Sequence, residues 1–474
     1  MDFISFLITS KYFGVISSLF VSVWVARMIL KKYKPQAVLF MGGIILLALG
    51  NPFLDIFTAV EKLFSNRVAG LGLLIMSVMG FVKYMDNIGA NRALVRVGVK
   101  PLQFIKSPYI VLVFAFLLGQ TLKIAITSAS GLGVLLMATM FPIMLRLGVS
   151  RAAATAVIAT TGCIDLGPAS GTGIATVEAA GILTSDGKAD MATYFIKYQL
   201  PVAIPVIIVV ALLHFIVQWW FDKKEGYVFR VNQSFKTNDT KNEICAPAFY
   251  AVLPLIPLLL VLIFNEMTIF EINWLLAFFG SSIVIPSKTI GLMAAILISV
   301  FLTMIIEYFR SFNTQKVFDS IQTVFDGMGL AFAGVITLIV AGETFAAGLL
   351  STGAINTLLD FAKDAGAGVV PLTLFMQGLI VIASILMGSG DAAIFSFLSV
   401  GTIVAEHFNA EAIAVLMPMQ ICSSLARSIS PITAVVVAVS AIAEISPVEV
   451  VKRTAIPMIG GIITLTIVNI ILFL

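Results

Sequence analysis

Apolar stretches of about 20 residues recur along the whole chain, and they constrain its fold more than any other feature. A stretch of that length can cross the hydrocarbon core of a bilayer as a helix. Only 11% of the 474 residues are charged, whereas a soluble globular protein has about 25%. The longest polar stretch, 222–243, is too short to bury a core of its own. The sequence therefore predicts an all-α polytopic membrane protein surrounded by lipid bilayer.

Composition and charge also exclude several kinds of site and partner. The two histidines and three cysteines lie at no metal-ligand spacing, so we predict no metal site and no cofactor. The net charge is only +4 and no basic patch is interleaved with aromatic residues, so nucleic acid is not an expected partner. Lys31, Lys32 and Lys34 follow the first apolar stretch, whereas a cleavable signal peptide has its basic residues before it. We therefore expect the first helix to be retained.

Lysines and arginines in short loops mark the cytoplasmic side of a membrane protein, and they divide this chain into two halves. The first half, 1–221, is predicted to contain scaffold helices over about 11–95, a hairpin over 108–147, a broken helix over 152–182 and a helix over 193–221. After a cytoplasmic linker at 222–246, the second half, 247–474, gives the same series in the opposite orientation: scaffold helices over about 247–350, a hairpin over 370–406, a broken helix over 411–445 and a helix over 455–474. Both chain termini are then periplasmic. The first hairpin is either two full crossings or a re-entrant element with its polar tip in mid-membrane.

Matched glycines and prolines relate the two halves. Three pairs have nearly constant separations: Gly131 and Gly390 at 259 positions, Pro168 and Pro431 at 263, and Gly89 and Gly353 at 264. With the opposite orientations, these separations predict two inverted-topology repeats, each with a re-entrant hairpin and a broken helix. Such repeats are typical of secondary transporters, whose substrate sites lie near the midplane on discontinuous helices.

Four polar segments interrupt the apolar helices: the tips 127–131 and 388–391 and the breaks 160–172 and 423–433. Irregular backbone at membrane depth persists only where it is buried in protein or lines a water-filled cavity. The N-termini of half-helices can bind carboxylates, and freed carbonyls can hold a small cation. The sequence therefore places the working site at these segments.

Arg427 is the strongest candidate for substrate contact. A charge at the bilayer centre costs about 2.5–3.5 kcal/mol on the permissive insertion scale, so it marks function, and the guanidinium fork matches a carboxylate. The alternative is a structural ion pair with Asp165, Asp391 or Glu343. Hydroxyl groups and glycines of the tips and breaks are expected to complete the substrate site: Ser128, Ser130, Gly131, Ser170, Thr172, Ser389, Gly390, Ser430 and Thr433.

Two acids lie in the same segments, Asp165 in the first break and Asp391 at the second tip. Either could bind a coupling cation, carry a proton or neutralise Arg427. We predict that Asp391, Asp165 and Thr161 form the site of a coupling ion, H⁺ or Na⁺. Glu343 and Lys83 sit late in their helices, where snorkelling or pairing within the scaffold is expected.

These segments resemble the DcuC family of anaerobic C4-dicarboxylate carriers, within the ion-transporter superfamily. The matching stretches are 127–142 (TSASGLGVLLMATMFP), 310–317 (RSFNTQKV), 387–390 (MGSG), 426–437 (ARSISPITAVVV), 446–457 (SPVEVVKRTAIP) and the run 65–72. The resemblance implies a bacterial inner-membrane carrier of succinate, fumarate or malate, acting by symport, efflux or exchange. It also implies an elevator-type motion, in which tips and breaks move with the substrate against a scaffold, within a homodimer.

Other functions remain open from the residues alone. A carrier of the same fold could take another carboxylate, or an amino acid whose ammonium group meets Asp391. A channel would need a continuous pore with charged or carbonyl rings. An intramembrane enzyme would need a Ser/His pair or two aspartates, and His214 and His407 are expected to lie far from the serine clusters. We therefore expect a transporter and not an enzyme.

Overall fold

The structure is a computed structural model that describes residues 11–105, 107–184, 187–227, 246–264, 290–366 and 368–474. Over these residues the chain is helical, and the one β feature is an isolated antiparallel bridge between Leu183 and Ala189. Seven helices within the described ranges are long and apolar enough to cross a membrane. The predicted all-helical, multi-span fold is confirmed to that extent.

The first half of the chain contains scaffold helices followed by two short antiparallel arms and a long helix. Its elements are α2 (Lys11–Leu30), α3 (Pro35–Gly50), α4 (Phe53–Arg67), η1 (Val68–Gly72), α5 (Leu73–Asn87), α6 (Ala90–Val99), η2 (Lys100–Phe104), α7 (Pro108–Lys123), α8 (Ala129–Arg146), α9 (Arg151–Thr160), α10 (Gly171–Ala179), α11 (Met191–Thr193), η3 (Tyr194–Gln199) and α12 (Leu200–Lys224).

The second half repeats long helices and short segments separated by breaks. Its described elements are η4 (Ala248–Leu255), α13 (Ile256–Ile263), α15 (Leu292–Ser311), α16 (Thr314–Ala331), η5 (Phe332–Ile336), α17 (Thr337–Ser351), α18 (Ala354–Asp364), α19 (Val369–Met387), α20 (Gly390–His407), α21 (Ala412–Arg427), α22 (Ala434–Ala443) and α23 (Pro447–Phe473).

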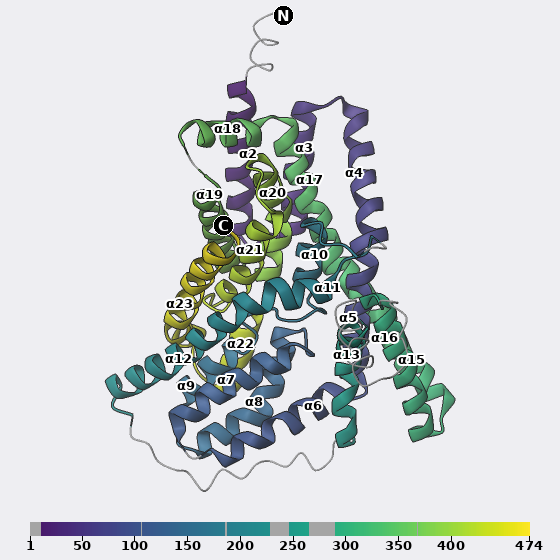
Figure 1. Cartoon of the computed structure of the whole chain (residues 1–474), viewed down its shortest axis with the longest axis vertical. Coiled ribbons are helices and arrows are strands. Elements are labelled where there is room, and N and C mark those ends of the chain that lie inside the picture. The colour runs from purple at the N-terminus through teal and green to yellow at the C-terminus, as the bar shows by residue number, and fades with distance from the viewer. Residues whose placement is uncertain (1–10, 106, 185–186, 228–245, 265–289, 367) are drawn as a thin grey trace, which may run out of the picture.

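The helices pack as two groups, and each group takes elements from both halves of the chain (Figure 1). In one group α3 packs along α17 and α2, α4 contacts α17, and α5 packs along α16 and α15. In the other, α12 packs along α23, α21 lies between α19, α20 and α23, and α8 contacts α22. We call these the scaffold group and the core group. They meet mainly where α17 contacts α20, with smaller contacts of α19 on α2 and of α10 on α5 and η1.

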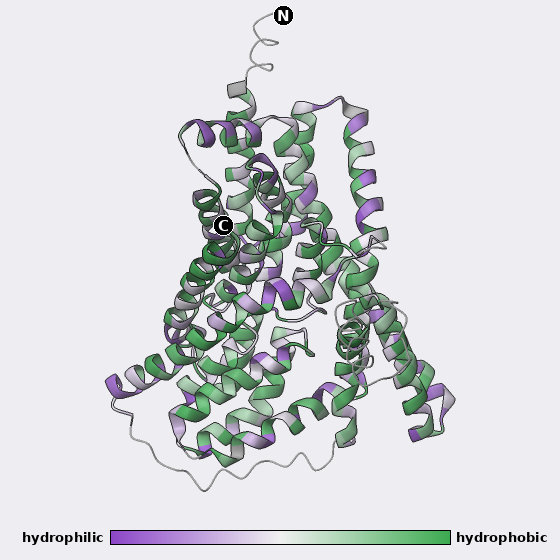
Figure 2. Ribbon diagram, viewed as in Figure 1, coloured by the Kyte–Doolittle hydropathy of each residue, from purple (hydrophilic) through white to green (hydrophobic). Residues whose placement is uncertain are grey.

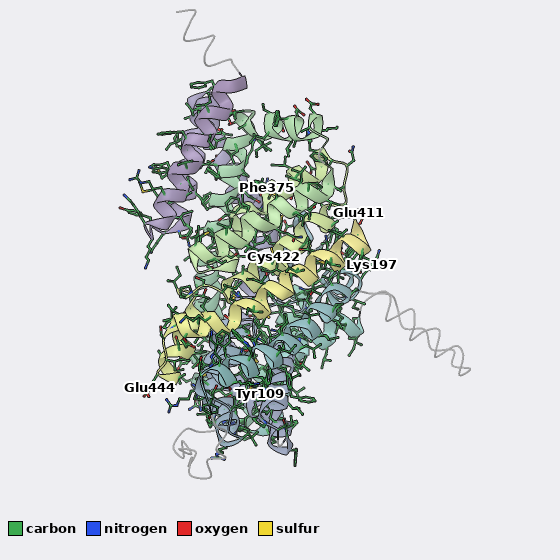
Figure 3. All side chains as sticks on the ribbon, turned by 90° about the vertical axis from the view of Figure 1, so that its left-hand side faces the viewer. Tyr109, Lys197, Phe375, Glu411, Cys422 and Glu444 are labelled. Atoms are coloured by element: carbon green, nitrogen blue, oxygen red, sulfur yellow. The ribbon has the colours of Figure 1, made fainter. Side chains whose placement is uncertain are left out.

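The outer surface of the core group is apolar. On α23, isoleucines exposed at helical spacing form one stripe, made of Ile456, Ile459, Ile463, Ile467 and Ile471. Figure 3 shows α23, in yellow, running obliquely across this side of the molecule, and Figure 2 shows the green, hydrophobic colour on most helices. At the end of α12, Lys223 and Lys224 lie over the rings of Trp219 and Trp220. Amphipathic aromatic residues beside lysines are typical of the membrane–water interface.

Candidate functional site

Four helix N-termini of the core group converge on one cavity of about 250 Å³, which α5 and η5 line on its other side. The helices are α8 and α10 from the first half and α20 and α22 from the second. The cavity is lined by the N-cap residue of each helix: Ser128, Ser170, Ser389 and Thr433. A helix N-terminus carries partial positive charge and unpaired N–H groups, so it favours an anion. Four of them at one cavity give it a backbone potential that favours an anion.

Serines start three of these helices because a serine side chain can replace the missing hydrogen-bond partner of the first turn. The Oγ of Ser128 accepts from the backbone N–H of Gly131 at 3.1 Å. Ser170 caps α10 and Ser389 caps α20 in the same way. Each of these Oγ atoms accepts a hydrogen bond, so the hydroxyl protons of Ser128 and Ser389 can be donated to a bound anion. The Ser170 Oγ also lies 3.0 Å from Thr172 Oγ1 and shares a hydrogen bond with it.

Close backbone approach fixes the second tip against α21. Gly388 has φ +63°, in the left-handed region that favours glycine. At Gly390, a Cβ atom would lie 2.4 Å from the backbone oxygen of Ser423. The two glycines therefore let α20 begin in direct contact with the end of α21, next to Arg427.

Arg427 ends α21 and holds both predicted acids. Its side chain is 8% exposed, and its Nη2 atom lies 3.0 Å from Asp165 Oδ1. Nη2 also donates to the carbonyl of Gly162 at 2.7 Å, and Nη1 donates to Asp391 Oδ1 at 3.1 Å. The alternative partner Glu343 lies elsewhere, on Arg67. The structure thus brings the charges of the first break, the second tip and the second break together.

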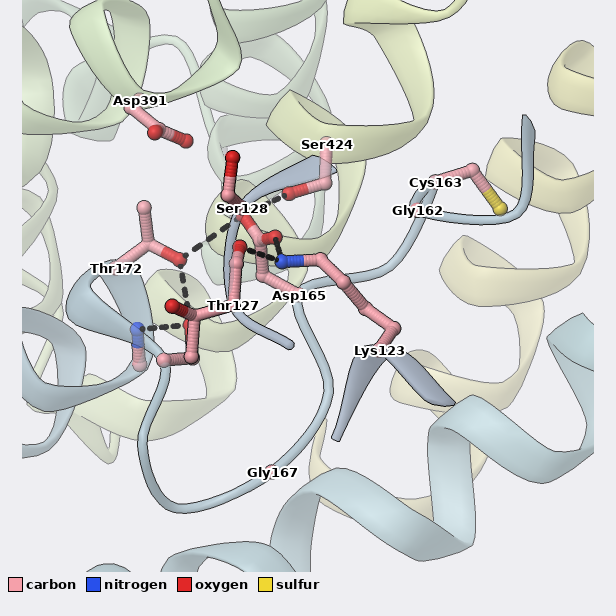
Figure 4. A network of polar contacts seen from close by, with 12 residues as sticks. Lys123, Thr127, Ser128, Gly162, Cys163, Asp165, Gly167, Thr172, Asp391 and Ser424 are labelled. Carbon is pink, nitrogen blue, oxygen red and sulfur yellow. Dashed lines mark hydrogen bonds and ion pairs between the residues drawn. The ribbon is translucent and has the colours of Figure 1, made fainter. Parts of the chain in front are cut away.

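Asp165 and Asp391 differ in how many side chains contact their carboxylates. Asp165 Oδ1 contacts Lys123 Nζ at 2.8 Å in addition to Arg427. Asp165 Oδ2 accepts from Ser424 Oγ at 2.9 Å and from Thr172 Oγ1 at 3.5 Å, as Figure 4 shows. The Asp165 side chain is 7% exposed, whereas that of Asp391 is 52% exposed. Among the described residues, Asp391 forms one ion pair, with Arg427. Four side chains therefore hold the Asp165 carboxylate in place. Asp391 is held by Arg427 and faces the cavity.

Lys123 is a charged residue of this site that the sequence interpretation missed. It ends α7, its side chain is 3% exposed, and its Nζ atom also donates to the backbone carbonyl of Thr127 at the first tip. The residue lines the cavity. A lysine four positions before a polar tip inside an apolar arm was the available signal, since an intramembrane charge marks a site by default.

Uncharged polar side chains form hydrogen bonds with the backbone of the first break, and the sequence interpretation did not identify them. Gln199 donates to the carbonyl of Asp165 at 2.9 Å and accepts from the N–H of Gly167. Gln420 on α21 donates to Thr172 Oγ1 at 3.1 Å. Thr127 lines the cavity, and its Oγ1 atom is buried without a hydrogen-bond partner among the described residues. A buried hydroxyl in that position is one that a ligand could satisfy.

The structure brings most of the predicted site residues to the cavity and leaves others away from it. The lining residues include Ser130, Thr172, Asp165, Asp391 and Arg427, together with the four N-caps.

Four predicted residues lie outside that lining: Gly131, Gly390, Thr161 and Ser430. Thr161 Oγ1 donates to the carbonyl of Ile158 and Ser430 Oγ to that of Ile385, so both hydroxyls satisfy nearby backbone. Gly131 supplies the capped N–H of the first turn of α8.

The titratable side chains among the lining residues are Lys123, Asp165, Asp391 and Arg427. Two positive and two negative charges make the cavity neutral when all four are ionised. A bound dianion therefore needs positive charge from elsewhere, because uncompensated charge away from water is costly. The arrangement can bind a carboxylate if Arg427 exchanges Asp391 for the ligand.

A second cavity, of about 370 Å³, lies where the two groups meet. Arg67, at the end of α4, contacts Glu343 of α17 at 2.6 Å and Glu178 of α10 at 3.2 Å. Phe395 on α20 lines both cavities. The ion pair to Glu178 joins the scaffold group to the core group close to the central site.

Comparisons with known proteins agree on one family. The family model described as C4-dicarboxylate anaerobic carrier matches residues 13–474. The chain is 37% identical to a probable anaerobic C4-dicarboxylate transporter DcuC of Vibrio cholerae, over 94% of each chain. It is 36% identical to the anaerobic C4-dicarboxylate transporter DcuC of Escherichia coli, over 94% of this chain and 93% of the relative.

A solved structure shares the fold. The Alcanivorax borkumensis YdaH transporter matches with a TM-score of 0.54 at 15% identity, over 96% of this chain and 98% of that one. At that identity the match bears on the fold alone.

Proposed function

We propose that this chain, which belongs to the DcuC family of C4-dicarboxylate anaerobic carriers, is a secondary transporter of C4-dicarboxylates such as succinate, fumarate and malate. The family consists of transporters, so the prediction of a multi-pass membrane transporter and not an enzyme is confirmed. The finer statements below, on substrate, coupling and motion, are proposals.

One observation carries the substrate proposal: four helix N-termini and the Arg427 guanidinium line the same cavity. A dicarboxylate has two carboxylates, and this cavity offers two kinds of carboxylate partner. One carboxylate would bind the Arg427 guanidinium, and the other would accept hydrogen bonds from N–H and hydroxyl groups at the helix N-termini. The N-cap hydroxyls of Ser128, Ser170 and Ser389, with Ser130 and Thr172, would complete the site. Thr433 would contribute through the N-terminus of α22, because its hydroxyl donates to the backbone carbonyl of Arg427 at 2.6 Å.

Asp391 is the proposed coupling group. Its carboxylate lies 3.1 Å from Arg427 Nη1, in the position that a substrate carboxylate would take. A proton or Na⁺ on Asp391 would weaken that ion pair and release Nη1 to the substrate. Asp165 is less suited to this role, because two cations and two hydroxyls already contact it. Thr161 is also less suited, since its hydroxyl donates to Ile158.

For the transport motion, we propose that the core group moves as a body against the scaffold group, in the manner of an elevator. Two features support this: each group packs extensively within itself, and the contacts between groups are fewer. The same proposal includes the inverted repeats 1–221 and 247–474 joined by the linker 222–246, a re-entrant setting of both hairpins, a homodimer in the bacterial inner membrane, and periplasmic termini.

A second candidate substrate class is favoured by the exposure of Asp391. A carboxylate that is 52% exposed in the cavity could pair with the ammonium group of an amino acid, while Arg427 binds its carboxylate. That reading makes Asp391 a substrate ligand, and it predicts that amino acids compete with succinate.

The test is uptake into proteoliposomes containing the purified protein, with protein-free liposomes as the control. Labelled succinate and fumarate are offered under imposed H⁺ and Na⁺ gradients, with unlabelled malate and an amino-acid panel as competitors. We expect saturable uptake of succinate and fumarate that malate inhibits and that one cation gradient accelerates. If neither dicarboxylate moves nor competes, the substrate proposal is wrong, and uptake of an amino acid would establish the second candidate.

A further inference from the structure

Lys123 is a buried cation that the proposed transport cycle does not use. Its side chain is 3% exposed, and its Nζ atom contacts the same oxygen of Asp165 that Arg427 contacts. The ammonium group also donates to the carbonyl of Thr127 at the first tip (Figure 4). Asp165 would have a cation partner and two hydroxyl partners without Lys123. The second cation therefore calls for an explanation other than satisfying that acid.

The charge balance of the cavity supplies an explanation for the second cation, Lys123. Among the lining residues, the titratable groups are Lys123, Arg427, Asp165 and Asp391. With Lys123 balancing Asp165, and with Asp391 neutralised by a coupling cation, the full charge of Arg427 remains for the ligand. Without Lys123, the charge of Arg427 would be balanced by Asp165. The four helix N-termini alone would then have to compensate the ligand.

A dianion is more sensitive to that loss than a monoanion. The Coulomb energy of a ligand in a low-dielectric cavity scales with its charge, so one missing unit of positive charge costs a dianion about twice as much as a monoanion. We propose that Lys123 is the residue that makes this site selective for doubly charged carboxylates over singly charged ones. This inference rests on the proposed function, and it assigns Lys123 to specificity through charge and not to direct contact.

Succinate and its monoamide succinamate test the proposal, because they have nearly the same shape and differ by one charge. The readout is the concentration of each unlabelled compound that halves uptake of labelled succinate into proteoliposomes. We expect Lys123→Gln to raise that concentration for succinate by about tenfold or more relative to succinamate. Lys123→Arg, which keeps the charge, is expected to restore the preference for succinate. Lys83→Gln, on α5 and outside the cavity lining, is the matched control and should leave the ratio unchanged.

A merely structural role predicts a different pattern, in which both compounds weaken by the same factor and the ratio stays as in the wild type. That result would overturn the proposal.

If Lys123→Gln does not fold, Asp165→Asn is compared with the double variant Lys123→Gln/Asp165→Asn, which removes the same charge without leaving a buried acid. The double variant should favour succinamate relative to Asp165→Asn, and an equal ratio would contradict the inference. Failure of the wild type to transport succinate would instead reject the proposed function itself.

Discussion

At the scale of single residues, Asp165 and Asp391 show how environment separates two identical groups. Both contact Arg427, but Asp165 has contacts on both oxygens and Asp391 has one ion pair and faces the cavity. A buried charge that loses its partner is strongly destabilising, whereas a half-exposed one can be solvated. Neutral substitution of Asp165 should therefore destabilise the protein far more than neutral substitution of Asp391.

Asp165→Asn is expected to destabilise the protein. The substitution removes the shared partner of two buried cations, and breaking a buried pair costs about 3–5 kcal/mol. The measurement is the free energy of unfolding of purified protein in a denaturing-detergent titration. Asp391→Asn serves as the comparison and should change that free energy far less. Equal effects of the two variants would contradict the distinction between them.

Asp391→Asn is expected to change coupling more than folding. A neutral side chain cannot hold Arg427 by an ion pair, so Nη1 should accept a substrate carboxylate without a coupling cation. Uptake of labelled succinate is measured with and without an imposed cation gradient. We expect exchange of internal for external succinate to persist while acceleration by the gradient disappears. Retained acceleration would move the coupling role to another group.

Residues also show what the sequence could and could not predict. Glycine, proline and an intramembrane charge mark the breaks and Arg427, because these residues are costly inside an apolar helix. The pairing of Arg427 with Asp165, 262 positions earlier, depends on tertiary packing. Ser430 and Thr161 could not be told from the lining hydroxyls, since the direction of a side chain depends on where each helix ends.

At the scale of elements, the second hairpin depends on contact between backbones. The start of α20 lies against the end of α21 at Gly390, where a Cβ atom would come within 2.4 Å of the Ser423 oxygen. That contact positions Ser389 and Asp391 beside Arg427. A small displacement of the tip should therefore disturb binding.

Gly390→Ala is expected to weaken succinate binding by displacing the tip from α21. The neighbouring atom is backbone and cannot rotate away, so the helix itself has to shift. Gly378→Ala is the matched control: it lies on α19 in the same hairpin and no other atom lies within 4 Å of its added Cβ. Binding is measured by titration calorimetry on both variants. Equal affinity in the two would show that this contact does not position the site.

At the scale of the whole molecule, the core group must slide along the scaffold group if the elevator proposal holds. Gly70 in η1 and Glu178 on α10 face one another across this boundary and lie outside the lining of the central cavity, with a Cβ of residue 70 lying 3.5 Å from Glu178 Oε1. A cross-link here should stop transport. A cross-link inside the scaffold group should not.

The variant Gly70→Cys/Glu178→Cys is bridged with Hg²⁺ in a background without native cysteines. We expect succinate uptake to be lost on adding Hg²⁺ and recovered on removing it with excess thiol. Ser18→Cys/Thr352→Cys is the control, because the two hydroxyls are 2.7 Å apart and both belong to the scaffold group. Uptake that continues with the first pair bridged would argue against relative motion of the two groups.

The central claim is that Arg427 in the cavity binds the substrate carboxylate, and succinate binding by Arg427 variants tests it most directly. Calorimetry compares the wild type with Arg427→Lys, Arg427→Gln and the surface control Arg151→Gln, whose side chain is 48% exposed. Hydrogen bonds to charged groups contribute about 1.5–3 kcal/mol, so we expect Arg427→Gln to bind succinate roughly ten- to a hundredfold more weakly. Arg427→Lys should be weakened and Arg151→Gln should match the wild type. Wild-type affinity in both Arg427 variants would contradict the account.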